Sequence, residues 1–186
     1  PEAKKNFTRL INAFELVKTK KPVVLFVALG AAPTPFQVDE WLINFGYRKS
    51  NFLINKDFVS SSWEKNTVKL IVVVNQFHHL ACWAELGLAN AGTATEQLVG
   101  LGIPCISLPG HGPQFTLGFA KRQSRLLGGS VLTCKTKEVF AKRVLALMRD
   151  KSLCMRLGAI GQKRMGSAGG SEDLAQLILK NLFFYS

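Results

Sequence analysis

Runs of apolar residues alternate with amphipathic segments along this chain, and this alternation constrains the fold more than any other feature of the sequence. The runs VVLFVAL (23–29), KLIVVV (69–74) and IPCISL (103–108) are continuous, as is typical of strands covered on both faces. Strands that alternate with helices predict βαβ units with right-handed crossovers. We therefore expect a Rossmann-like, three-layer α/β domain with a mostly parallel sheet, whose ligands bind at the carboxyl ends of the strands.

The expected helices follow from apolar residues at helical spacing. Phe7, Leu10, Ile11, Phe14 and Val17 predict an amphipathic helix over residues 3–18. The same reasoning gives further helices over 36–45, 79–86, 95–101, 115–127, 140–148 and 171–182, and short strands over 87–91 and 128–133. No repeat, low-complexity tract or linker interrupts this order, so the prediction is one domain over residues 1–186.

Positive charge is abundant but unevenly distributed. The chain has 24 Lys and Arg against 12 Asp and Glu, a net charge of +12, yet no Lys or Arg lies between Lys69 and Lys121. Basic residues then follow closely: Lys121, Arg122, Arg125, Lys142, Arg143, Arg149, Lys151, Arg156, Lys163 and Arg164. Two interpretations stay open: solvated helix surfaces, or contact with an anionic partner such as a nucleotide phosphate, a nucleic acid or an acidic membrane surface.

The cysteines and the apolar runs indicate a compartment. Cys82, Cys105, Cys134 and Cys154 are scattered and form no CxxC pair, so we expect small buried thiols in a reducing environment. The opening stretch PEAKKNFTRL lacks the apolar core of a signal peptide, and the run over 23–30 is too short to span a bilayer. The expected location is therefore the cytoplasm.

The segment GLANAGTATEQL (87–98) predicts a strand that turns into a helix. Gly92 allows a sharp turn and a close approach of the backbone to a ligand. The free N–H groups of the first helical turn, at the positive end of the helix dipole, form an anion site that needs no lysine. Thr93, Ala94, Thr95 and Glu96 also fit a capping box, in which Glu96 would fold back on the backbone of Thr93. The pattern allows both functions, since a carboxylate has two oxygens.

The segment PGHGPQFT (109–116) follows the next strand, at the same end of the predicted sheet. Its glycines and prolines predict a defined turn, which is also what an ordinary loop would contain. As a partner of residues 92–96 it would form the neighbouring wall of one pocket.

Several kinds of chemistry are disfavoured by the residues available. His78 and His79 are adjacent and His111 stands alone, with no Cys, Asp or Glu at ligand spacing, so we expect no metal site. The aspartates form no pair for Mg²⁺, and neither a carboxylate pair for glycoside hydrolysis nor a G-x-S-x-G elbow is present. We name no catalytic residue and expect no cofactor.

The motif AGTATEQLVGLGIP (91–104), followed by LPGHGPQFTLGFAKRQSRLLGGSV (108–131), resembles the C-terminal half of the lipid-A-disaccharide-synthase-related proteins of bacteria. These are glycosyltransferases of the GT-B architecture. GQKRMGSAGGS (161–171) resembles the closing motif of that family, and the resemblance runs the length of the chain.

This resemblance implies a donor site for a nucleotide sugar, most simply a UDP-sugar. It implies that Gly92, Thr93, Ala94 and Thr95 face the diphosphate and that Glu96 binds the ribose hydroxyls. The loop of Gly110, His111, Gly112, Gln114, Phe115 and Thr116 would face the sugar and phosphates, and Phe77 and His78 would lie against the base. By analogy the hexosyl transfer would invert configuration and need no metal.

The sequence departs from the family in one respect. An N-terminal acceptor domain and a Gly-Ser-Arg motif, which would fall just before Pro1, have no counterpart here. Because the catalytic base of many GT-B enzymes comes from that domain, we expect this chain to correspond to the donor-binding half and to be inactive alone.

Two other classes of function stay open. The first is a basic binding module for a membrane surface or, less favoured because it lacks an aromatic platform, a nucleic acid. The second is a nucleotide-sugar epimerase domain, for which the extra catalytic carboxylates are missing. The basic surface would also serve a glycosyltransferase that docks peripherally on the inner face of an anionic membrane, near a lipid-linked acceptor.

Overall fold

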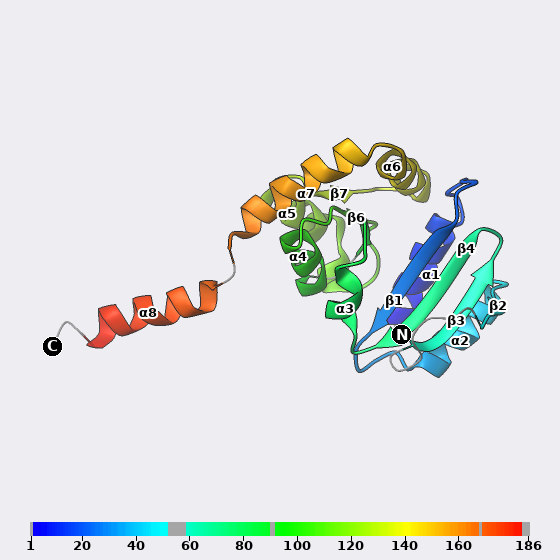
Figure 1. The fold of residues 1–186 in the computed structure, drawn as a ribbon, viewed down its shortest axis with the longest axis horizontal. Helices are drawn as coiled ribbons and strands as arrows, with labels where there is room; N and C mark the ends of the chain where they lie inside the picture. The colour runs from blue at the N-terminus through cyan, green and yellow to red at the C-terminus, as the bar shows by residue number, and fades with distance from the viewer. Residues whose placement is uncertain (1, 52–58, 90–91, 168, 184–186) are drawn as a thin grey trace.

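The strands of the protein form two separate sheets (Figure 1). The computed structural model describes residues 2–51, 59–89, 92–167 and 169–183. Sheet A has the order β1-β4-β3-β2, formed by β1 (Val23–Leu29), β4 (Val68–Val74), β3 (Val59–Lys65) and β2 (Arg48–Lys49). Sheet B has the order β5-β6-β7, formed by β5 (Gly87–Leu88), β6 (Cys105–Ser107) and β7 (Val131–Thr133). The class is mixed α/β, as predicted, but the expected single sheet is divided in two.

Sheet A is only partly parallel, which corrects the expected topology. Strands β1 and β4 pair in parallel, with Val23 opposite Val68, whereas β3 runs antiparallel to β4 and β2 antiparallel to β3. The sequence analysis missed β3 because its residues, VSSSWEK, contain no apolar run. Asn66, at φ 53°, adopts the left-handed conformation that a tight hairpin between β3 and β4 requires.

Sheet B follows the predicted βαβ pattern. Its strands are all parallel, and helices α4 (Thr93–Gly100) and α5 (Leu117–Leu126) connect them in the order β5-α4-β6-α5-β7. Parallel pairing requires a crossover of this kind, and each crossover helix covers a strand that is buried. The carboxyl ends of β5 and β6 therefore lie side by side.

Helix α1 (Glu2–Phe14) packs against parts of both sheets. Its residues Ala13 and Phe14 belong to one apolar cluster with Ile106 of β6 and with α6 (Lys137–Arg149). Ile11 belongs to a second cluster, with the buried face of α2 (Pro35–Asn44) and the strands of sheet A. One amphipathic helix thus shares its apolar surface between the two halves of the fold.

Helix α7 (Lys151–Met165), which periodicity alone did not predict, packs against α4 through glycines. A Cβ atom on Gly158 would lie 1.9 Å from the carbonyl oxygen of Gly102, and one on Gly161 would lie 2.5 Å from a methyl group of Val99. The bare helix face permits this close approach, and any side chain there would separate α7 from α4.

Helix α8 (Gly170–Phe183), in red in Figure 1, projects away from the rest of the molecule. Its large apolar side chains are 46–70% exposed: Leu174, Leu177, Ile178, Leu179 and Leu182. None of the helices in the described residues combines the length and apolar character that a bilayer crossing requires.

The four cysteines are free, and their burial differs from the expectation. Cys105 and Cys134 are buried, as predicted. Cys82 is exposed and Cys154 is half-buried, because Cys82 lies in the turn after α3 and Cys154 on the surface of α7. Burial raises the pKa of Cys105 to about 12, so this thiol stays protonated and behaves as an apolar core residue.

Candidate functional site at the carboxyl edge of sheet B

The amino end of α4 forms without the predicted capping box. The helix N-cap is Gly92, whose carbonyl accepts the first helical hydrogen bond from the N–H of Glu96 at 3.2 Å, and no side chain caps the helix. Because the helix starts at Thr93, the Thr93 hydroxyl is one position too late to act as a cap. The capping interpretation of residues 93–96 is therefore wrong.

Gln123 of α5 positions Glu96 instead. The Gln123 side-chain amide donates to the carbonyl oxygen of Gly92 at 3.2 Å and to Glu96 Oε1 at 3.4 Å. Gln123 is buried and Glu96 is half-buried. Glu96 Oε2 has no hydrogen-bond partner among the described residues, so it is the oxygen that a ligand hydroxyl could reach. Sequence analysis missed Gln123, although a polar residue on the inner face of the predicted 115–127 helix was a signal.

The other two residues of the first turn differ in exposure. Ala94 is half-buried, whereas the side chain of Thr95 is completely buried. The backbone carbonyl of Thr95 accepts a weak hydrogen bond from the Cys105 thiol at 4.0 Å. The Thr95 hydroxyl is therefore out of reach of a ligand.

The loop after β6 is a compact turn held by its own backbone. The N–H of Gly110 donates to the carbonyl of Phe115 at 2.8 Å, and the N–H of Phe115 donates to the carbonyl of Gly112 at 3.1 Å. Gly112 has a φ of 106°, which is open mainly to glycine, and a short 3₁₀ helix, η1 (Pro113–Phe115), follows it. Thr116 then caps α5, its hydroxyl accepting the Phe119 N–H at 3.2 Å. Thr116 thus has a structural function that the sequence analysis did not assign.

Helix α1 fixes the same loop from outside the sheet. The side chain of Asn6 donates to the carbonyl of His111 at 2.9 Å and accepts the His111 N–H at 2.8 Å. Asn6 is buried and His111 is exposed, so this pair of hydrogen bonds joins two segments 105 residues apart at a partly buried position. A buried asparagine within an amphipathic helix was the sequence signal for this contact.

The structure brings the two predicted segments to one edge of sheet B. Leu88 of β5 is in register with Ile106 of β6, so residues 92–96 and 110–116 both follow the carboxyl ends of neighbouring strands. Helix α5 begins in the second segment and reaches the first through Gln123. The Phe119 ring also approaches Gly92, where a Cβ atom would lie 3.8 Å away.

The residues predicted to lie against a base have a different environment. Phe77 opens the short helix α3 (Phe77–Ala81) and packs on the apolar cluster of Leu98 and Cys105, so part of its side chain belongs to the core. His78 is exposed, and its ring lies 4.0 Å from that of His79. Of these two residues, only His78 has a freely exposed side chain.

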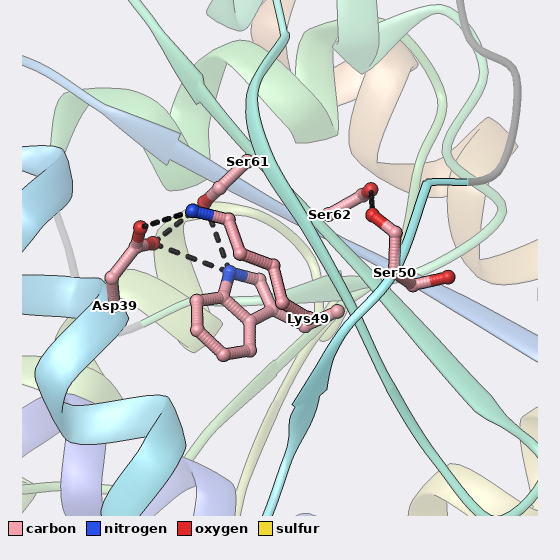
Figure 2. Close-up of polar contacts among 6 residues, drawn as sticks. Asp39, Lys49, Ser50, Ser61 and Ser62 are labelled. Carbon is pink, nitrogen blue, oxygen red and sulfur yellow. Dashed lines mark hydrogen bonds and ion pairs between the residues drawn. The ribbon is translucent and has the colours of Figure 1, made fainter.

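A separate polar network joins α2 to sheet A (Figure 2). Asp39 accepts hydrogen bonds from the Ser61 hydroxyl at 2.6 Å and the Trp63 indole at 3.2 Å, and Lys49 lies 3.9 Å from its second oxygen. Nearby, the Ser62 hydroxyl donates to the backbone carbonyl of Ser50. Because these buried polar groups satisfy one another, the network serves to hold α2 on β3.

The ion pairs of the described residues all lie on the sheet A side. They join Arg48 to Glu64, Lys49 to Asp39, and Lys65 to Glu15. Residues 117–165 contain twelve Lys and Arg against two carboxylates, and none of these cations pairs with a carboxylate of the described chain. Sheet B is therefore flanked by a surface whose positive charge is uncompensated.

Two surface hollows lie away from the predicted site. One, of about 310 Å³, runs along the outer edge of β7 and is lined by Lys121, Ser124 and Arg143 among others. The second, of about 550 Å³, lies at the amino ends of β1 and β4 and includes Lys18, Lys20 and Tyr47. The residues of the candidate site, 92–96 and 110–116, line neither hollow. Among the described residues, no three His, Cys, Asp or Glu side chains come together to hold a metal ion.

The fold is mixed α/β, with a parallel sheet whose carboxyl edge carries the amino end of α4 and the Glu96 carboxylate. Comparison of the chain with protein-family models, with curated proteins and with solved structures finds no match.

Proposed function

We propose that this chain is the nucleotide-sugar-binding, C-terminal half of a GT-B glycosyltransferase, with a Rossmann-like arrangement around sheet B. The observation that carries the proposal is the pairing of an uncapped amino end of α4 with Glu96, one turn further along the same helix. The donor is a UDP-sugar, bound at the carboxyl edge of β5 and β6.

Each group at this edge has a function in that proposal. The N–H groups of Thr93 and Ala94 bind the diphosphate, because a helix amino end supplies both donors and a favourable dipole. Glu96 Oε2 accepts the ribose hydroxyls while Gln123 holds its other oxygen. The 110–116 loop faces the sugar, and His78 lies against the base. Backbone donors and a positive flank stabilise the diphosphate, so binding needs no divalent metal.

The transfer reaction belongs to the complete protein. In the proposal, an N-terminal domain brings the acceptor and the catalytic base, and the hexosyl group passes to it across the cleft. Since transfer requires both substrates in alignment, the 186-residue chain alone binds donor without transferring sugar.

The test is a thermal-shift and calorimetric titration with UDP, with EDTA or with Mg²⁺. A ligand at 100 times its Kd adds about 2.7 kcal/mol to the free energy of unfolding, a shift well within detection. We expect UDP to stabilise the protein equally under both conditions. Absence of any effect of UDP or UDP-sugars would overturn the proposal, and binding only with Mg²⁺ would overturn its metal independence.

A second candidate function rests on the uncompensated cations of residues 117–165. In this alternative the domain is a module that docks on the anionic inner face of a membrane, from the cytoplasm, by electrostatic attraction. Its signature is co-sedimentation with phosphatidylglycerol vesicles that falls steeply with salt, together with no response to UDP. Binding to both would instead indicate a membrane-associated glycosyltransferase.

A further inference from the structure

Arg9 on α1 has an unsatisfied hydrogen-bonding group. Its Nε is buried and has no hydrogen-bond partner. No other buried side-chain nitrogen or oxygen of the described residues lacks one. No carboxylate of the described chain lies within 4.0 Å of its guanidinium. Leaving a buried charged donor unpaired is costly, and such groups in folded proteins usually have a function or a partner outside the chain.

Helix geometry places Arg9 beside the 110–116 loop. Residues three, four and seven apart lie on one face of a helix, so Glu2, Asn6 and Arg9 share a face of α1. Two of these three residues reach the loop: Asn6 bonds the main chain of His111, and a Cβ atom on Gly112 would lie 2.8 Å from Glu2 Oε2. Arg9 follows Asn6 by three residues, one turn further along α1.

The polar and charged groups around this position do not satisfy Arg9. Asn6 bonds His111 through its amide oxygen and nitrogen, and it does not bond Arg9 Nε. Glu2 is the nearby carboxylate, and it is exposed and not paired with Arg9. A guanidinium presents a planar fork of donors that matches a phosphate in a bidentate manner.

We infer that Arg9 binds a phosphate group of the ligand at the junction between α1 and the 110–116 loop. The identity of that phosphate as part of a nucleotide diphosphate rests on the proposed function. In this arrangement α4 supplies backbone donors to the diphosphate. Arg9 supplies the positively charged side chain that residues 87–104 lack. Arg9 is thus a binding residue contributed by the first helix of the chain, far in sequence from the rest of the site.

The experiment compares Arg9→Gln, Arg9→Lys and a control, Arg149→Gln, at an exposed position of α6. Calorimetric titrations use three probes: UDP, uridine and inorganic pyrophosphate. We expect Arg9→Gln to weaken UDP and pyrophosphate by at least about tenfold and to leave uridine unchanged, because only the phosphates meet the guanidinium. Arg9→Lys should fall between, since it keeps the charge and loses the fork.

The outcomes separate this inference from the proposed function. If the wild type binds pyrophosphate through Arg9 but neither UDP nor uridine, the nucleotide proposal fails and Arg9 remains an anion site. If Arg9→Gln binds all probes as the wild type does, the inference is overturned while the nucleotide proposal stands. If the wild type binds neither UDP nor pyrophosphate, the inference is overturned as well.

The melting temperature of Arg9→Gln should equal or exceed that of the wild type, because the substitution removes an unpaired buried donor. If Arg9→Gln does not fold, the titrations of Arg9→Lys are the test. An unchanged affinity of Arg9→Lys for UDP and pyrophosphate would then overturn the inference.

Discussion

Replacing Gly158 with alanine tests how closely α7 must approach the helix that carries the candidate site. A Cβ atom at this position would lie 1.9 Å from the carbonyl oxygen of Gly102 and 2.9 Å from its carbon. Close carbon–oxygen contacts in proteins are about 3.3 Å, so α7 or the turn must move by about 1.4 Å. The obstacle is backbone rather than a flexible side chain, and no rotamer change relieves it.

The expected magnitude follows from two opposed effects. Overpacking costs typically about 1–3 kcal/mol, and a clash with backbone belongs at the upper end of that range. Alanine in place of glycine within a helix returns about 1 kcal/mol. The net loss should therefore be about 2 kcal/mol, which lowers the melting temperature of a chain of this size by about 4–8 °C. The affinity for UDP should fall too, because the movement disturbs helix α4, on which we propose that the diphosphate binds.

The assay is urea unfolding followed by circular dichroism and tryptophan fluorescence, with Gly118→Ala as the matched control. Gly118 is also helical, but its nearest contact for a Cβ atom is the Thr116 hydroxyl at 4.0 Å. We expect the control to stay within about 0.5 kcal/mol of wild type or to gain stability. A Gly158→Ala protein as stable as the control would refute the close packing of α7 on α4.

Three further predictions concern single side chains. Glu96→Gln should lower the affinity for UDP roughly ten- to hundredfold with little change in stability. Thr93→Ala should change the free energy of unfolding by less than about 0.5 kcal/mol. Paired titrations and melting curves check both variants, and unchanged UDP binding by Glu96→Gln would remove Glu96 from the proposed ribose site. Burial raises the pKa of Tyr47 from 10.0 to about 12, so the stability that its protonated form confers is present below pH 10 and is lost as the pH rises toward 12. When the urea midpoint of unfolding is measured as a function of pH, it should fall less steeply for Tyr47→Phe than for wild type. Parallel profiles for the two proteins would contradict this prediction. A thiol reagent at pH 8 should modify exposed Cys82 in the folded protein and reach Cys105 only on unfolding, as mass spectrometry would show, and early labelling of Cys105 would contradict its burial.

The spacing of apolar residues predicted those helices and strands that bury one apolar face or lie wholly within the core. The runs at 69–74 and 103–108 became the buried strands β4 and β6. The run at 23–29 became β1, but the expectation that it is covered on both faces is wrong, because β1 is an edge strand in which only Leu29 is buried. Strand β3 could not be found in the same way, because it owes its burial to Trp63 and to serines that bond Asp39 and Ser50. The division into two sheets depends on pairings between distant segments, which periodicity does not record.

The candidate site was predictable where one segment determines its own geometry. The turn at Gly92 and the helix that follows it are local and were predicted, although the helix runs over Thr93–Gly100 and not over 95–101. The capping box failed because the helix starts one residue earlier than the pattern implied. The contributions of Gln123 and Asn6 come from other elements, and only the tertiary structure brings them to the edge of sheet B.

The bond between Asn6 and His111 also has a consequence for biosynthesis. A ribosome adds about 5–20 residues per second, so the 105 residues that separate the two partners take about 5–20 s to make. Throughout that interval the apolar face of α1 has neither β6 nor α6 to cover it, since both are encoded later. The nascent chain therefore presents an amphipathic helix that needs shielding, and synonymous codons that slow translation before residue 111 would lengthen its exposure to chaperones and to aggregation.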